Sequence, residues 1–118
     1  MRVAIVGSRH YPTMNDVRFY ISKLAARKWD GGLVIVSGGI EDGVDAVAFE
    51  TAEALGLETM IWKPDYDQYG RAAPLVRNGA IVADADLVVA FWDGISPGTH
   101  DTIKKALKAH RHTEVIFP

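Results

Sequence analysis

The segment Val3-Ala4-Ile5-Val6-Gly7-Ser8-Arg9 is an uninterrupted apolar run that ends in a polar turn containing glycine. Two further segments repeat this layout: residues 33–39, LVIVSGG, and residues 87–99, LVVAFWDGISPGT. An unbroken run of Val, Ile and Leu suits a parallel strand that is buried on both faces. Glycine after such a strand lets the backbone come close to a ligand. The three segments therefore predict an α/β domain that holds a ligand at one edge of its sheet.

Expected strands and helices alternate along the chain. Five strands are expected, at residues 2–7, 33–37, 59–62, 87–92 and 114–117. Four helices are expected between them, at residues 15–29, 43–55, 74–83 and 99–110, and residues 64–73 are expected to form a polar loop. Strict alternation implies parallel strands with right-handed crossovers. The predicted fold is a Rossmann-like three-layer sandwich, with a five-stranded parallel sheet ordered 3-2-1-4-5 and helices on both faces.

This strand order predicts the place of a ligand site. Strands one and four are neighbours in it, and the helices that follow them lie on opposite faces of the sheet. A crevice opens between their carboxyl ends. The turns at Gly7-Ser8-Arg9 and at residues 93–99 flank that crevice, so the topology and the glycine positions point to the same edge.

Size and composition narrow the class of protein. A chain of 118 residues forms a single domain, 1–118, and its 48% hydrophobic and 24% charged residues are ordinary for a globular protein. The absence of cysteine excludes disulfides, thiolate nucleophiles and Cys-ligated zinc. No leader precedes the first strand and no apolar run approaches the length of a membrane span, so a cytoplasmic location without a membrane partner is expected.

The formal net charge of −2 bears on the class of partner. A chain that binds nucleic acid usually presents a clearly basic face. On this ground we expect a small molecule as the ligand, and we do not expect nucleic acid as a partner.

Four stretches of the chain resemble a known family. They are GSR after the first strand, SGG followed by GVD after the second, DYDQYGRAAPLVRN at residues 65–78, and ADLVVAFWDGISPGT at residues 85–99. Together they look like the SLOG superfamily of Rossmann-like domains, in particular its small YspA-like branch. The superfamily includes cytokinin-activating phosphoribohydrolases, DprA-type DNA-handling proteins and sensors of nucleotide-derived signals. The resemblance covers nearly the whole chain and implies a nucleotide-type ligand and self-association into a homo-oligomer.

The chain departs from the family pattern at two places. Where YspA-like proteins usually read SGG-Ala-Arg-Gly-Val-Asp, residues 37–45 read SGGIEDGVD, which is one residue longer and carries acids in place of the arginine. The phosphoribohydrolases carry a glutamate three places after the threonine of their Gly-Thr motif, and Thr102 occupies that place here. A hydrolase assignment taken from them lacks one catalytic carboxylate.

The leading hypothesis is a module that binds a small nucleotide or a nucleotide-derived ligand, such as an ADP-ribose-type compound or a nucleoside monophosphate. The N–H groups of Gly98 and Thr99 would hold a phosphate at a helix start, unless this turn is only a helix cap. Asp45 would accept hydrogen bonds from ribose hydroxyls, or it only favours the positive end of its helix. The expected ligand-binding residues are Gly7, Ser8, Arg9, Ser37, Gly38, Gly39, Asp45, Arg77, Asn78, Asp93, Gly98, Thr99 and His100.

Two alternatives stay open. The first is an N-glycosidase or phosphoribohydrolase acting on nucleoside monophosphates, with Arg77 positioning the phosphate and Glu50 or Asp101 as the catalytic carboxylate. The second, by analogy with the DprA-type relatives, is the handling of single-stranded DNA. Analogy of fold alone supports that second reading.

Four carboxylates are expected near the same rim, and they would repel a phosphate unless something compensates them. Arg9, Arg77 and the helix ends could outweigh them, a divalent cation could bridge them to the phosphate, or the ligand could present hydroxyls there. No resident metal site is predicted. The rim acids are Glu41, Asp42, Asp93 and Asp101.

Overall fold

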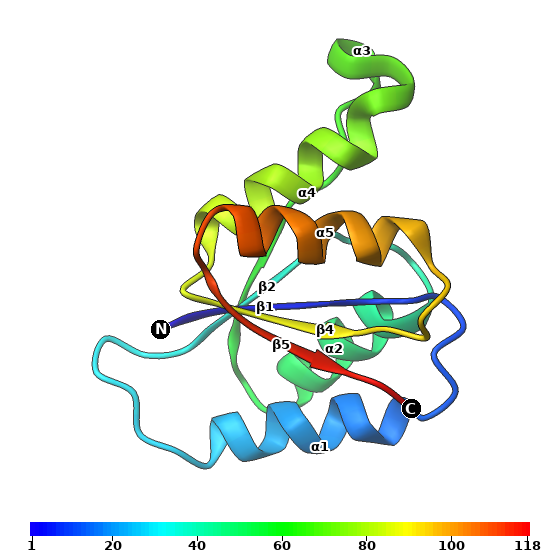
Figure 1. Ribbon diagram of the computed structural model, residues 1–118. Helices are drawn as coiled ribbons and strands as arrows, with labels where there is room; N and C mark the ends of the chain where they lie inside the picture. The colour runs from blue at the N-terminus through cyan, green and yellow to red at the C-terminus, as the bar shows by residue number, and fades with distance from the viewer.

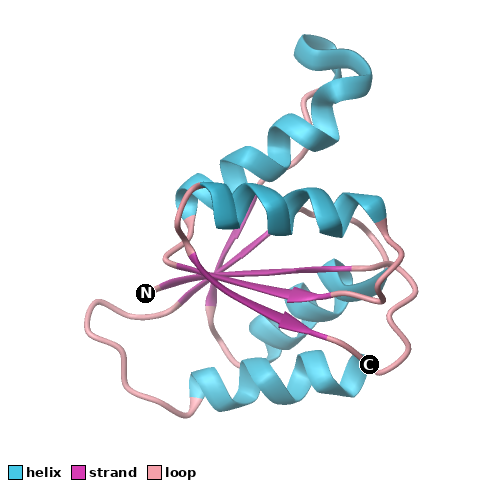
Figure 2. Ribbon diagram, viewed as in Figure 1, coloured by secondary structure: helices cyan, strands magenta, loops and turns pink.

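The computed structural model describes residues 1–118 and confirms the predicted sheet. Its five strands run parallel in the order β3-β2-β1-β4-β5. The register places Val3 beside Leu87 and Gly7 beside Phe91, so β4 pairs with β1 over its whole length. Figure 2 shows the strands splayed across one another, the twist that parallel sheets adopt. The strands are β1 (Arg2–Gly7), β2 (Val34–Ser37), β3 (Glu58–Ile61), β4 (Leu87–Phe91) and β5 (His112–Ile116).

Helices cover both faces of the sheet. Two of them, α1 (Met14–Ala25) and α2 (Gly43–Ala54), lie on one face, and α4 (Ala73–Asp84) and α5 (Pro97–Lys108) lie on the other (Figure 1). This placement of the helices gives the predicted three-layer arrangement. None of these helices has the length and apolar character that crossing a bilayer would require.

The apolar runs form two cores, one on each side of the sheet. Successive residues of a strand point to opposite faces. In β1, Val3 and Ile5 therefore pack with α1 and α2, while Ala4 and Val6 pack with α4 and α5. All four are buried. This double burial explains why the strand carries no polar residue between Val3 and Val6, as parallel strands covered on both faces require.

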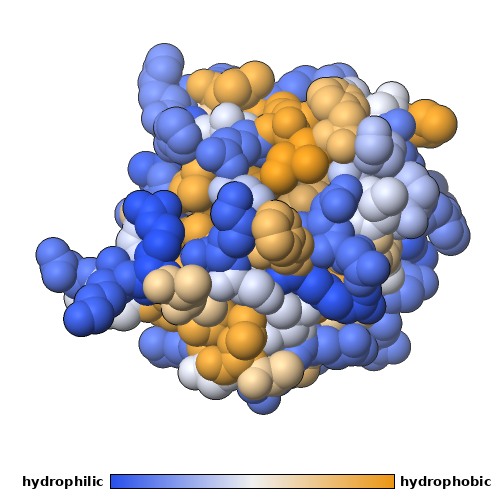
Figure 3. All heavy atoms as spheres, turned by 90° about the horizontal axis from the view of Figure 1, so that it is seen from below, coloured by the Kyte–Doolittle hydropathy of each residue, from blue (hydrophilic) through white to orange (hydrophobic).

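The outer surface of the α1 and α2 layer is mixed in character. Seen from below, hydrophobic groups are separated by hydrophilic ones rather than forming one continuous face (Figure 3). The exposed large apolar side chains of these helices include Phe19 and Phe49. The expected homo-oligomer stays a prediction.

Most of the predicted bounds differ from the structure by one or two residues, and two predictions differ by more. The first helix ends at Ala25 rather than at residue 29, because Trp29 folds back and its indole N–H donates to the carbonyl of Leu24 at 2.8 Å. The segment 64–73 is not a plain loop. It contains α3 (Tyr66–Tyr69) and a short 3-10 turn (Gly70–Ala72). Asp65 starts α3, since its carboxylate accepts the N–H of Gln68 at 3.1 Å.

Candidate functional site

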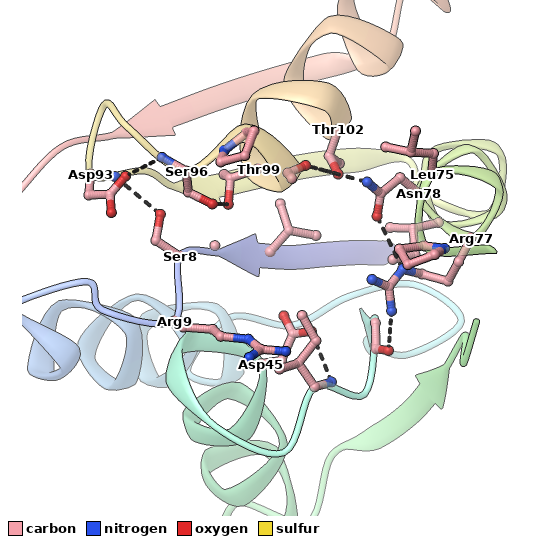
Figure 4. A pocket seen from close by; sticks show the side chains of 18 of the residues that line it. Ser8, Arg9, Asp45, Leu75, Arg77, Asn78, Asp93, Ser96, Thr99 and Thr102 are labelled. Atoms are coloured by element: carbon pink, nitrogen blue, oxygen red, sulfur yellow. Dashed lines mark hydrogen bonds between the residues drawn. The ribbon is translucent and has the colours of Figure 1, made fainter. Parts of the chain in front are cut away.

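A cavity of about 460 Å³ lies at the carboxyl ends of β1 and β4. The three turns singled out in the sequence converge on it, through Ser8 after β1, Gly38 after β2 and Thr99 at the start of α5. Figure 4 shows Ser8 and Thr99 on its wall. Its volume falls in the range of sites that hold a nucleotide-sized molecule. The place is the crevice that the strand order predicts.

One wall of the cavity is the first turn of α5. Pro97 opens this helix, and the N–H groups of the next two residues, Gly98 and Thr99, find no acceptor in the protein. Such unpaired groups at a helix start carry a partial positive charge. The Thr99 hydroxyl lies 3.3 Å from that of Ser96, and Thr99 is buried. This wall therefore offers N–H and O–H donors without a carboxylate in its first turn.

The loop between β4 and α5 is held by hydrogen bonds that shape this wall. The Asp93 carboxylate accepts the N–H groups of Ser96 at 2.8 Å and Ile95 at 2.9 Å, and these contacts hold the pKa of Asp93 below its usual value. The backbone N–H of Asp93 in turn donates to the Ser8 hydroxyl at 3.3 Å. The Ser8 hydroxyl also interacts with the Asp93 carboxylate and contributes to lowering the pKa of Asp93.

Arg77 reaches into the cavity from α4. Its guanidinium donates to the carbonyl of Gly38, to the carbonyl of Trp62 at 3.4 Å and to the Asn78 side chain at 3.1 Å. Burial lowers the pKa of Arg77, which still leaves a cation at neutral pH. A Cβ on Gly38 would lie 2.7 Å from the Arg77 guanidinium and 3.0 Å from the Asp45 carboxylate. Glycine at this position therefore lets both charged groups approach the turn as they do here; a larger residue would require these side chains to shift.

Asp45 forms the opposite wall, in the first turn of α2. Its side chain is 5% exposed, and one carboxylate oxygen accepts the N–H of Ile40 at 3.2 Å. Burial raises the pKa of Asp45 to about 6, although Arg77 and Arg9 oppose the shift. Asp45 is therefore largely ionised at neutral pH, although its buried surroundings disfavour the charged form.

Two other carboxylates of the expected rim, Asp42 and Asp101, are paired with basic side chains, whereas Glu41 has no such partner and lines the adjoining cavity. Asp42 pairs with Arg9 at 3.5 Å. Asp101 pairs with Lys105 at 2.6 Å and accepts the Asn78 amide at 3.1 Å. Burial raises the pKa of Asp101, but these two donors outweigh it and hold the pKa below its usual value. The repulsion expected from Asp42 and Asp101 is thus reduced by their basic partners.

No three histidine, aspartate or glutamate side chains come together in the structure as a metal site would require. A bridging divalent cation would therefore draw most of its ligands from a bound phosphate. That cation stays a prediction.

Ten of the residues expected to bind the ligand line the cavity: Gly7, Ser8, Arg9, Gly38, Asp45, Arg77, Asn78, Asp93, Gly98 and Thr99. Gly7 has a packing role as well, because a Cβ there would lie 2.6 Å from the Phe91 carbonyl oxygen and 2.7 Å from the Val44 side chain. This contact lets β1 approach both β4 and α2.

Five other candidates do not line this cavity. Ser37 is fully buried at the end of β2, and its hydroxyl has no partner. Gly39 lines a neighbouring cavity instead. His100 is exposed, with its ring stacked on Trp92 at a centroid distance of 5.1 Å. Glu50 is exposed on α2 and does not line the cavity. Asp101, the other candidate for the catalytic carboxylate, is bound to Lys105 and also does not line the cavity.

Other residues of the lining were not predicted. Ser96 and Thr102 both contact the start of α5, and the Thr102 hydroxyl donates to the Gly98 carbonyl at 3.3 Å. Ser96 could have been found from the Ser-Pro pair, since serine is favoured just before a helix that opens with proline. Ile40 and Pro74 carry no chemical signal, because an apolar lining residue is indistinguishable in sequence from a core residue.

A second cavity of about 530 Å³ adjoins the first. The two linings share five residues: Arg9, Gly38, Ile40, Pro74 and Arg77. Tyr66 of α3, which is 60% exposed, lines the second cavity only. The two arginines therefore stand at the boundary between the cavities.

No protein-family model matches the chain, and no curated protein matches it, but solved structures do. DNA processing protein A (DprA) from Streptococcus pneumoniae has a TM-score of 0.78 at 22% identity, over 97% of this chain and 49% of that one. DprA from Helicobacter pylori has a TM-score of 0.75 at 24% identity, over 98% and 64%. The molybdenum cofactor carrier protein from Chlamydomonas reinhardtii has a TM-score of 0.69 at 21% identity, over 97% and 74%.

These likenesses show the fold that the chain shares with DprA, a Rossmann-like domain with the strand order described above. The chain spans less than two thirds of either DprA protein. They do not support the finer assignment to the YspA-like branch, which stays a prediction.

The expectation that nucleic acid is not a partner is wrong, because one protein of this fold, the DprA of Helicobacter pylori, binds single-stranded DNA. We based that expectation on the formal net charge of the whole chain, which is −2. Affinity for a phosphate backbone depends instead on the charges of the face in contact.

Proposed function

We propose that the cavity at the ends of β1 and β4 binds a small nucleotide or a nucleotide-derived ligand, with a phosphate group over the start of α5. One observation carries the proposal: Gly98 and Thr99, whose N–H groups are unpaired at the start of α5, line a cavity of nucleotide size. A helix start with free N–H groups favours an anion. Arg77 adds a cation on the same cavity.

The adjoining cavity favours a ligand larger than a phosphate. A nucleoside monophosphate would fill the first cavity, and an ADP-ribose-type compound would extend past Arg9 and Arg77 into the second. There the exposed ring of Tyr66 offers an apolar face for a base.

Titration calorimetry with AMP, ADP-ribose and adenosine tests the proposal. We expect AMP to bind more tightly than adenosine by about tenfold or more, because only AMP carries the charged acceptor for the α5 donors. If neither AMP nor ADP-ribose binds, or if adenosine binds as well as AMP, the phosphate site is not where we place it.

A second candidate is the binding of single-stranded nucleic acid, and the likeness to the DprA of Helicobacter pylori favours it. The same phosphate site would then hold one backbone phosphate of a strand, and the second cavity would hold its neighbour. A polymer contacts several phosphates at once, so its affinity falls steeply with added salt. Titration of a short oligodeoxythymidine at two salt concentrations separates the candidates, because AMP binding depends on salt far less.

The enzymatic alternative has no observation in its favour. Glu50 is exposed and lies outside the cavity, and Asp101 is bound to Lys105 and Asn78. We therefore do not propose an N-glycosidase.

A further inference from the structure

Asp45 is one of two acidic residues that line the cavity, and neither forms an ion pair. The other, Asp93, is partly exposed to solvent on its loop and accepts two backbone N–H groups, whereas the buried Asp45 accepts one. Its oxygen Oδ2 accepts the N–H of Ile40, and Oδ1 accepts no hydrogen bond from the protein. Oδ1 is also not among the enclosed atoms without a partner, which are confined to Tyr11 and Ser37. This oxygen of a 5%-exposed side chain therefore faces the cavity that Asp45 lines.

A buried carboxylate with a free oxygen requires a donor from elsewhere. Burial raises the pKa of Asp45 to about 6, so the side chain is mostly a carboxylate at neutral pH and accepts hydrogen bonds. An anionic group of a ligand would be repelled at this point. A cationic group would meet Arg9 and Arg77, which line the same cavity. Neutral hydroxyl donors are the class of group that fits.

The positions of the α5 wall and of Asp45 on the α2 wall indicate how the hydroxyl donors of a ligand would lie relative to its phosphate. Figure 4 shows Asp45 on one side of the end of β1 and the pair Ser96 and Thr99 on the other. A ligand that satisfies both walls carries an anion at one end and hydroxyl donors at the other. A ribose 5′-phosphate unit has this layout, with the phosphate at one end of the sugar and the 2′- and 3′-hydroxyls at the opposite edge.

We infer that Asp45 is a specificity-determining residue that accepts hydrogen bonds from the 2′- and 3′-hydroxyls of a ribose, so that the site selects ribonucleotides over deoxyribonucleotides. This inference rests on the proposed phosphate site. It adds the class of sugar and the orientation of the ligand, phosphate toward α5 and sugar edge toward α2.

Calorimetry with AMP and 2′-deoxy-AMP tests the inference at about pH 7.5, where the Asp45 carboxyl is mostly ionised. We expect the wild-type protein to prefer AMP by about tenfold or more, as befits a hydrogen bond to a charged acceptor. In Asp45→Asn the preference should fall to about twofold or less, because the amide keeps the shape and loses the charge. The matched control is Glu50→Gln, which removes a carboxylate from the exposed face of the same helix and should keep the preference.

A second measurement uses only the wild-type protein. The preference for AMP should decrease as the pH falls through about 6, where Asp45 becomes protonated. Taking the ratio of the two affinities cancels the titration of the phosphate, which both ligands share. The charged or titratable groups near Asp45 are Arg9 and His10 after β1, Asp42 before α2 and Arg77 on α4. They act on both ligands alike, so a ratio that changes with pH reports on Asp45.

The outcomes separate the inference from the proposed function. Equal affinities for AMP and 2′-deoxy-AMP in the wild-type protein would overturn the role of Asp45 and leave the phosphate site standing. A preference that survives in Asp45→Asn, or that does not change with pH, would overturn it as well. If neither nucleotide binds, the proposed function itself fails.

Discussion

The two walls of the cavity share a backbone arrangement and differ in chemistry. In each, a buried strand leads through a glycine-containing turn into a helix of 12 residues that starts at the cavity. The first turn of α5 contains no acidic residue, and its N–H groups are free. The first turn of α2 contains Asp45, and the N–H of Val44 is already bound to the Ser8 carbonyl at 3.4 Å.

The comparison teaches that a helix start favours an anion only where its side chains allow it. The partial charge at a helix N-terminus is about half an elementary charge, and it acts within the first turn. One carboxylate placed there is enough to cancel it. The α5 wall therefore suits a phosphate, and the α2 wall suits a neutral donor.

The largest predicted effect comes from making the α5 wall resemble the α2 wall. A side chain on Gly98 would enter open space, so Gly98→Asp adds a carboxylate without a steric clash. We expect the affinity for AMP to fall by about a hundredfold or more, since the new charge repels the phosphate and competes for the free N–H groups. Calorimetry measures this loss.

Gly98→Asn is the matched control, because it adds the same shape without the charge. It should retain AMP binding within about tenfold. Thermal unfolding should show that Gly98→Asp is folded, because an acidic residue in the first turn of a helix is favourable. Equal AMP affinities in the two variants would mean that the phosphate does not lie at α5.

The second prediction concerns the free energy of unfolding, which the burial of the Asp45 carboxylate in the α2 wall lowers at neutral pH. The folded-state pKa of Asp45, about 6, lies above its usual value of 3.8. The stability that this group contributes is therefore present below about pH 4 and is lost as the pH rises through about 6. Asp45→Asn should be more stable than wild type at about pH 7.5 in the absence of ligand, by up to about 3 kcal/mol.

Urea unfolding across this pH range measures the difference between the two proteins. It should vanish below about pH 4, where the wild-type carboxyl is also neutral. A difference in stability that does not depend on pH would show that the carboxylate is not destabilised by burial.

The third prediction concerns the loop that shapes the α5 wall. Asp93→Ala removes the acceptor for the N–H groups of Ile95 and Ser96 and loosens the residues before α5. The affinity for AMP should fall by about threefold to tenfold, because the loop must be ordered on binding. Asp93→Asn keeps an acceptor oxygen and should lose less. If both variants bind AMP as the wild type does, the loop does not contribute to the site.

The smallest effect is expected on the outer face of α2. Glu50→Gln should change neither the affinity for AMP nor the stability by more than a measurement error, because Glu50 is exposed and lies outside the cavity. Incubation with AMP, read by release of free adenine, provides the second readout. Release by the wild type that disappears in Glu50→Gln would restore the enzymatic alternative.

The sequence predicted the sheet well because the apolar runs that indicate the strands are also the residues that pack against the helices on both faces. The run from Val3 to Val6 is buried on both faces, and the order 3-2-1-4-5 is confirmed. Boundaries were less accurate where a single contact decides them. Trp29 folds back on Leu24 and ends α1 early, and Asp65 starts α3 inside an expected loop. Neither contact has a periodic signal in the sequence.

The candidate site was predicted in part. Ser8, Gly38 and Thr99 were found because they follow strands, and strand ends meet at one edge of the sheet. Glu50 was placed in the site as a possible catalytic group, and helical geometry explains why it lies elsewhere. Five residues after Asp45, the helix has turned by about 140° from the direction of the cavity. The pairing of Asp101 with Lys105 depends on how α4 and α5 pack, which no local pattern reveals.

The central claim is that a phosphate is held by the first turn of α5, and backbone amide chemical shifts test it most directly. Isotope-labelled protein is titrated with AMP and, in parallel, with adenosine. The account predicts that the amides of Gly98 and Thr99 shift strongly with AMP and much less with adenosine. AMP binding that leaves both amides unchanged, while resonances outside the cavity move, would contradict it.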